Sequence, residues 1–200
     1  ENRFSLSDQT KNLLERLDED VYVEVYLAGE LPSNFLRFQK SIRETLEEFS
    51  IYSNTNFNYK FIDPSLAQSA KARNKYYQDL IQRGLQPTNL NYTQDGQTSQ
   101  KWVFPGLILS YHGREVGINL LKGNRTTSPE EMINKSIEGL EYELASGLIQ
   151  LSELRRKRVG LVVGHNEPDT AQLAGFTNLV FFSYIVYLIF ERKKEVYKSN

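Results

Sequence analysis

VFPGLILSYHGREVGINLL, residues 103–121, is the stretch of sequence that decides the fold. Two apolar runs flank the dipeptide His112-Gly113, and two such runs around a glycine-containing pair predict a β-hairpin. Pro105 stands at the entrance of the first run, where a proline removes no hydrogen bond from the middle of a sheet. We therefore expect two buried antiparallel strands, with His112 at an exposed turn.

The first third of the chain combines helix and strand patterns. FSLSDQTKNLLERLDED, residues 4–20, predicts a short helix that is capped by Ser7 or Asp8. VYVEVYLAG, residues 21–29, alternates and is rich in β-branched and aromatic residues, so it predicts a strand. After Ser33, apolar residues spaced by three and four predict a helix: Phe35, Phe38, Ile42, Leu46 and Phe49.

The residues that lead up to the hairpin continue this alternation. FNYKFIDPS predicts a second strand, which the dipeptide Asp63-Pro64 ends. Residues 65–83 predict a helix of weaker amphipathicity, and Gly84 is a plausible C-terminal stop. PTNLNYTQDGQTSQ, residues 87–100, is polar and almost free of aliphatic residues, which favours a loop.

A long helix is expected after the hairpin, from Ser128 to about Arg156. Ser128 is expected as the N-cap, with Pro129 at the first helical position and Glu131 completing a capping box. One apolar stripe runs along the helix, with Tyr142 and Ile149 off it: Ile133, Ile137, Leu140, Leu144, Leu148 and Leu151. The stripe is longer than a small domain covers, so the helix is expected to bridge to a second domain or to a partner. The alternative is a plain core helix with a frayed end.

Taken together, these elements predict an α/β protein. The order β-α-β-α-β-β-α up to residue 157 resembles the thioredoxin-like fold, and in that fold Phe104-Pro105 would occupy the place of a cis-proline. RVGLVVGH and YIVYLIF are expected to be strands on either side of a short helix. We therefore expect a thioredoxin-like domain over 1–157 and the truncated start of a doubly wound α/β domain over 158–200.

The composition excludes several functions. The chain contains no cysteine, which excludes disulfides, Cys-ligated zinc and thiol catalysis. The loop AGELPSN, which follows the first strand, offers only a serine and a glutamate where a redox enzyme needs a thiolate. The 24 Lys and Arg residues of the whole chain nearly balance its 25 Asp and Glu residues, so no overall electrostatic field favours nucleic acid. Neither an enzyme activity nor a cofactor is expected.

The segment LVFFSYIVYLIF, residues 179–190, is the candidate for a membrane segment. Its 12 residues fall short of the roughly 20 that span a bilayer. It is therefore interpreted as a helix end and a strand in the folded core. The basic run Arg155–Arg158 is interpreted as the solvated end of the long helix, not as a nucleic-acid site.

GHNEPD, residues 164–169, carries the ligand-binding candidates. His165, Asn166, Glu167 and Asp169 follow a predicted strand, at the end where open α/β sheets bind ligands. His112 is the other histidine of the chain and lies far away in sequence, so no metal site and no catalytic residue is assigned. The alternative interpretation of GHNEPD is a turn in which Asp169 caps a helix.

Five segments resemble the extracytoplasmic region of the gliding-motility-associated ABC transporter auxiliary (substrate-binding-like) proteins, a group of ABC-type uncharacterised transport systems. In order along the chain they are FSLSDQTKNLLERLDEDVYVEVYLAGELP, FIDPS, QRGLQPTNL, VFPGLILSYHGREVGINLL and GLVVGHNEPD. The resemblance implies a non-catalytic auxiliary subunit on the periplasmic side of the bacterial cytoplasmic membrane. It also implies ABC permease and ATPase subunits as partners, and membrane segments before Glu1 and beyond Asn200.

Two other functions remain open from the sequence. One is a small-ligand-binding domain with a pocket next to His165, and the other is a hydrolase or metal enzyme centred on GHNEPD. Self-association is open as well. No sequence motif indicates which substrate is transported or whether the chain is coupled to ATP hydrolysis.

Overall fold

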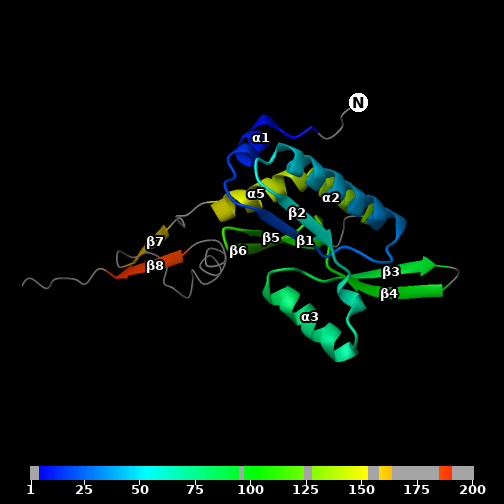
Figure 1. Cartoon of the computed structure of the whole chain (residues 1–200). Helices are drawn as coiled ribbons and strands as arrows, with labels where there is room; N and C mark the ends of the chain where they lie inside the picture. The colour runs from blue at the N-terminus through cyan, green and yellow to red at the C-terminus, as the bar shows by residue number, and fades with distance from the viewer. Residues whose placement is uncertain (1–4, 95–96, 124–127, 153–157, 164–184, 191–200) are drawn as a thin grey trace, which may run out of the picture. The chain divides into compact units, whose positions relative to one another are not determined.

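A four-stranded mixed sheet in the order β2-β1-β5-β6 organises the first part of the chain (Figure 1). β1 (Val21–Val25) pairs in parallel with β2 (Phe57–Phe61) and antiparallel with β5 (Gly106–Tyr111). β5 pairs antiparallel with β6 (Arg114–Asn119). The computed structural model describes residues 5–94, 97–123, 128–152, 158–163 and 185–190. The predicted α/β class is confirmed.

Helices cover both faces of this sheet (Figure 1). α1 (Asp8–Glu15), α2 (Ser33–Tyr52), α4 (Pro129–Glu138) and α5 (Leu140–Ser152) pack on one face, and α3 (Ala70–Gln82) lies on the other. Because side chains alternate along a strand, β1 sends its three valines into the larger core and Glu24 to the face of α3. The predicted apolar stripe of α2 is buried in that larger core.

The smaller core lies between the sheet and α3. Its fully or almost fully buried members are Tyr26, Leu80, Leu85, Phe104 and Ile108. A 3₁₀ turn, η1 (Pro64–Leu66), precedes α3, and Ser69 caps the helix with its hydroxyl. Gly84 has a φ of 94°, the left-handed conformation that ends many helices, so the predicted stop is confirmed.

The hairpin predicted from residues 103–121 is confirmed. His112 and Gly113 connect β5 to β6 with φ values of 52° and 67°, as a tight two-residue turn of positive φ requires. The expected cis bond before Pro105 is wrong, because no described peptide bond is cis. In the trans form, which is the lower-energy isomer, the Pro105 carbonyl accepts from the N–H groups of Leu120 and Leu121 at 2.9 and 3.3 Å.

The expected loop over residues 87–100 is a second correction. β3 (Thr88–Gln94) and β4 (Gln97–Val103) form an antiparallel hairpin that extends away from the four-stranded sheet (Figure 1). Leu90 and Val103 anchor its base in the larger core. The signal lay in the dipeptide Asp95-Gly96 between two runs, which favours a two-residue hairpin connection despite the polar composition.

The single long helix is a third correction. Gly139 separates α4 from α5, although Ser128 caps α4 and Pro129 opens it as predicted. Leu148 and Leu151 are buried in the larger core with residues of α1, α2 and β5. The expected bridge is therefore wrong, because the first part of the chain itself covers the far end of the stripe. Tyr142 and Ile149 are exposed, as expected.

The chain divides into two compact units, Glu1–Ser152 and Glu153–Asn200. In the second unit, β7 (Arg158–Val163) pairs in parallel with β8 (Ile185–Phe190), so the two predicted strands are confirmed. Residues 155–157 of the basic run and 179–184 of the apolar segment lie outside the described residues. No helix in the described ranges is long and apolar enough to cross a membrane. The truncated doubly wound domain and its boundary at residue 158 stay predictions.

Candidate binding site

α3 leaves part of its face of the sheet uncovered. Along β5, Ile108 is buried beneath the helix, while Ser110, two residues further on, is only partly covered. Along β1, the side chain of Tyr22 is 53% exposed. Two hollows of about 480 and 510 Å³ lie over this area, and both are lined by Tyr22 and Ser110. We call these two hollows, which share Tyr22 and Ser110, the trough.

The floor of the trough is set by strand register. Tyr22 pairs with Asn58 on β2 and with Ser110 on β5, and Ser110 pairs with Glu115 on β6. Paired residues of neighbouring strands point to the same face of a sheet. The row from Asn58 to Glu115 therefore carries amide, phenol, hydroxyl and carboxylate groups. This part of the sheet presents hydrogen-bonding groups to the outside.

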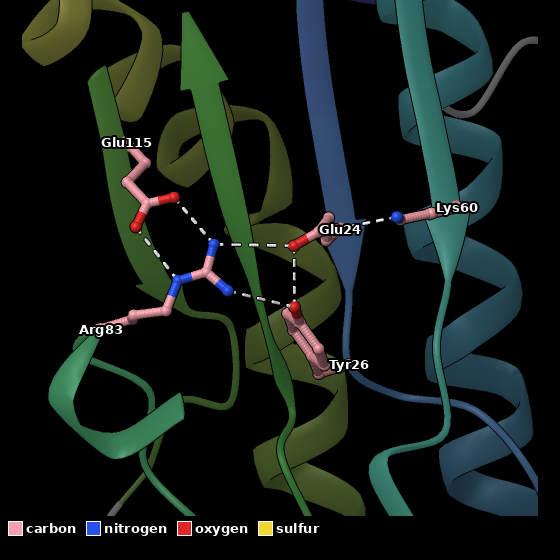
Figure 2. A network of polar contacts seen from close by, with 5 residues as sticks. All are labelled: Glu24, Tyr26, Lys60, Arg83 and Glu115. Carbon is pink, nitrogen blue, oxygen red and sulfur yellow. Dashed lines mark hydrogen bonds and ion pairs between the residues drawn. The ribbon is translucent and has the colours of Figure 1, made fainter. Parts of the chain in front are cut away.

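Arg83, at the end of α3, forms one wall (Figure 2). Its Nε and Nη2 donate to the two carboxylate oxygens of Glu115, at 3.1 and 2.7 Å. Nη2 also lies 3.6 Å from Glu24 Oε2. The bidentate contact raises the pKa of Arg83 further above its ordinary value. This guanidinium is therefore fixed between β6 and β1.

Glu24 joins the same network (Figure 2). Its carboxylate accepts a hydrogen bond of 2.8 Å from the Tyr26 hydroxyl and lies 2.9 Å from Lys60 Nζ. Burial acts to raise the pKa of Glu24, but Lys60, Tyr26 and Arg83 outweigh it and lower the pKa below its ordinary value. Burial and Glu24 together raise the pKa of Tyr26, so this hydroxyl stays protonated as a donor. The wall is a satisfied network of charges.

A glycine allows α3 to end so close to the sheet. A Cβ on Gly117 of β6 would lie 2.2 Å from the carbonyl oxygen of Arg83, closer than atoms can approach. Asn119 then fixes the segment after the helix, because its side chain donates to the Gly84 carbonyl and accepts from the Gln86 N–H. These contacts place Arg83 at the border between the covered and uncovered parts of the face.

The opposite wall of the trough is acidic. His112, at the hairpin turn, contacts two carboxylates of the loop after α1: Nε2 lies 2.9 Å from Asp18 Oδ1, and Nδ1 lies 3.3 Å from Glu19 Oε1. The Tyr111 hydroxyl donates to Asp18 at 2.6 Å and contributes most to the lowered pKa of that carboxyl. Asp20 accepts from the backbone N–H and side-chain amide of Asn56.

A separate ion pair lies near the loop after β1. Asp63 is nearly buried, with 8% of its side chain exposed, and its Oδ2 lies 3.2 Å from Lys101 Nζ on β4. Asp63 also accepts from the N–H and hydroxyl of Ser65. Gly29, with a φ of 87°, leaves the space that this carboxylate occupies. The pair links the β3–β4 hairpin to the end of β2.

The ligand-binding residues predicted from the sequence belong to the segment GHNEPD. His165, Asn166, Glu167 and Asp169 are outside the described residues, so the structure places none of them. In the described ranges, no group of three or more His, Cys, Asp or Glu side chains could hold a metal ion. Sequence reasoning missed the trough, because its residues come from separate segments. The local signal lay in β1, where Tyr22 and Glu24 alternate with the buried valines and therefore point to the other face of the sheet.

Comparison with known proteins adds a family but no activity. The family described as "Domain of unknown function (DUF7088)" matches residues 1–110, more than half of the chain. An uncharacterised protein of Borreliella burgdorferi is 27% identical over 161 residues, which make up 80% of this chain and 28% of that protein. The chain thus spans little more than a quarter of the length of this relative. No solved structure matches the chain. The match over residues 1–110, from the chain start through most of β5, shows that the chain belongs to the DUF7088 family.

Proposed function

We propose that this chain is a non-catalytic auxiliary part of an ABC transport system linked to gliding motility, and that it binds a partner through the trough. The observation that carries the binding role is the uncovered part of the sheet over Tyr22 and Ser110, enclosed by two charged walls. Concave surfaces with a few convergent polar groups are the usual binding sites of proteins. The five segments that resemble the ABC auxiliary proteins supply the biological setting.

We also propose that the first unit is a thioredoxin-like domain without redox chemistry. Its strand order β2-β1-β5-β6, with only the β1–β2 pair parallel, supports this assignment. So does the placement of α2 and α5 opposite α3. The trans bond before Pro105 and the inserted β3–β4 hairpin depart from the expected pattern. In place of a thiol, the Asp63–Lys101 pair occupies the region of the loop after β1.

The proposed setting is the periplasmic side of the cytoplasmic membrane. The permease and ATPase subunits are the proposed partners, and the membrane is reached through segments outside residues 1–200. The charged groups around the trough favour a protein contact over a reaction. Glu24, Lys60, Arg83 and Glu115 bond to one another, which fixes them as a preformed surface. A preformed surface lowers the entropy lost on binding.

A blocked trough tests this proposal in the complete protein. Ser110→Arg would place a long charged side chain on the trough floor, between the two walls. We expect Ser110→Arg to reduce the recovery of ABC permease and ATPase subunits when the tagged protein is purified from detergent-solubilised membranes. Quantitative mass spectrometry of the recovered proteins measures the effect.

Ser50→Arg is the matched control, because Ser50 is an exposed serine on α2, on the opposite face of the sheet. Circular dichroism should give the same folded spectrum for both variants. Unchanged recovery with Ser110→Arg would overturn the role of the trough. Purification without any ABC subunit, even for the unchanged protein, would overturn the transport setting.

A further inference from the structure

The two ends of the trough differ in how their charges are compensated. At the α3 end, Glu24 and Glu115 share Arg83, and Glu24 also has Lys60. At the hairpin-turn end, Asp18, Glu19 and Asp20 follow one another in sequence. Within the described part of the chain, His112 is the one basic group in ion-pair distance of these three carboxylates, and it contacts only the first two. Three carboxylates therefore face a single imidazole, and the turn end is negative.

Tyr22 gives this negative end a specific chemistry. Its aromatic side chain is 53% exposed and lines both hollows, next to Glu19 and Asp20 in one of them. An ammonium or guanidinium group is attracted to the face of an exposed aromatic ring, and a carboxylate beside the ring adds a charge-assisted hydrogen bond. Asp20 has its amide contacts with Asn56 and no cation among the described residues. The pair Tyr22 and Asp20 thus matches a cationic side chain.

The length of the trough indicates more than a single cation. It runs from the hairpin turn across β5 and β1 to β2. Adjacent strands lie about 4.8 Å apart, so three strands span about 10 Å, the length of about three residues of extended chain. Asn58 and Ser110 along this path can bond to a peptide backbone.

We propose that the trough takes an extended cationic segment of a protein partner, with a lysine or arginine side chain over Tyr22 and in contact with Asp20 and Glu19. This inference rests on the proposed binding function and names the chemistry of the partner. The segment crosses the strands, and its far end lies beside Lys60 and Arg83. That end carries no further positive charge, because it would face two cations there.

Peptide binding to the full chain tests the proposal. The probe is a fluorescently labelled, end-capped peptide with one lysine followed by glycines, and the comparison probes are its lysine-acetylated form and spermidine. We expect the lysine peptide to bind at pH 7.5 at low salt, with anisotropy as the readout. Asp20→Asn and Tyr22→Ser should each weaken binding about fivefold, the size of a lost cation–π or charged contact. Glu138→Gln, an exposed carboxylate on α4, is the control and should bind normally.

The comparison probes decide between recognition and general attraction. Equal binding of the acetylated peptide, equal competition by spermidine at matched charge, or equal weakening by Glu138→Gln would each overturn the proposal.

The two proposals can fail separately. Suppose that Ser110→Arg abolishes recovery of the ABC subunits but Asp20→Asn and Tyr22→Ser leave recovery and peptide binding unchanged. The binding function then stands, and the cationic partner is wrong. If the peptide binds with the expected dependence on Asp20 and Tyr22 but no ABC subunit is recovered, the cationic segment stands and the transport setting is wrong.

Discussion

Breaking the Asp63–Lys101 pair should destabilise the first unit in a strongly asymmetric way. Asp63 has 8% and Lys101 18% of its side chain exposed, and their charged atoms lie 3.2 Å apart. Removing one partner of a buried pair costs about 3–5 kcal/mol when the remaining charge is left uncompensated. Asp63→Ala leaves Lys101 with the Glu30 carbonyl, at 3.3 Å, as its remaining acceptor. It also removes the acceptor that caps η1 at the Ser65 N–H, worth about 1 kcal/mol.

We expect Asp63→Ala to lower the free energy of unfolding by about 3–4 kcal/mol, because Lys101 keeps some contact with solvent. Lys101→Met should cost only about 1–2 kcal/mol, since Asp63 retains both Ser65 donors and methionine preserves most of the apolar stem. The double variant should be about as stable as Asp63→Ala. The coupling energy is then about 1–2 kcal/mol.

Urea unfolding of the full chain measures these values. Trp102 is the single tryptophan and adjoins Lys101 on β4, so its fluorescence reports on the hairpin, while circular dichroism follows the helices. Lys40→Met is the control, because Lys40 forms an exposed pair with Glu44 and should change stability by less than about 0.5 kcal/mol. Equal costs for Asp63→Ala and Lys101→Met, or a coupling energy near zero, would refute the reasoning.

Three further variants test the packing, the backbone and the carboxylates of the first unit. Leu148→Ala should cost about 2–5 kcal/mol in urea unfolding, whereas Ile149→Ala, at a position 47% exposed, should cost less than about 1 kcal/mol; similar costs would contradict the burial of α5. Gly29→Ala should destabilise the fold more than Gly113→Ala, because both glycines have positive φ but only a Cβ at position 29 would meet Asp63. Thermal melting compares the two variants, and equal melting temperatures would contradict the expected clash with Asp63. Burial acts to raise the pKa of Glu141, but hydrogen bonds from Ser7 and Thr10 outweigh it and lower the pKa below its ordinary 4.5. The ionised carboxylate therefore stabilises the fold above about pH 4.5, and the stability difference between the unchanged chain and Glu141→Gln should shrink as the pH falls from 6 towards 3; a constant difference would show that ionisation plays no part.

Local sequence signals were sufficient for the elements that depend on local physics. The backbone at His112 and Gly113 must adopt positive φ for the turn to close. The turn can therefore be predicted from the sequence without any knowledge of distant contacts. The polar β3–β4 hairpin was missed because its composition was weighed above the dipeptide Asp95-Gly96. The break at Gly139 was missed because the apolar stripe continues through it.

The site could not be predicted, because it is made of long-range contacts. Three strands, β3, β4 and β5, lie between Arg83 and Glu115 along the chain, and Glu24 lies far before Arg83, on β1. Nothing local distinguishes Arg83 from any other cation near a helix end, where the helix dipole favours positive charge. Only the register of β1 with β2 and β5 places Tyr22 beside Asn58 and Ser110.

At the edge of α3, side chains buried in the smaller core give way to side chains that line the trough. Ile108 and Ser110 point to the same face of β5, yet the first is buried under α3 and the second lies in the trough. Arg83 stands at this border and bonds to the Tyr26 hydroxyl at 3.4 Å, above the buried ring. A change at Arg83 therefore leaves a core hydroxyl and two carboxylates with fewer partners, and it must affect stability as well as any contact. Tyr22 and Asp20 lie beyond the border, where Tyr22 is 53% exposed and the contacts of Asp20 with Asn56 are exposed. Binding by this chain is therefore tested through Tyr22 and Asp20, because a loss of function at Arg83 would have two causes.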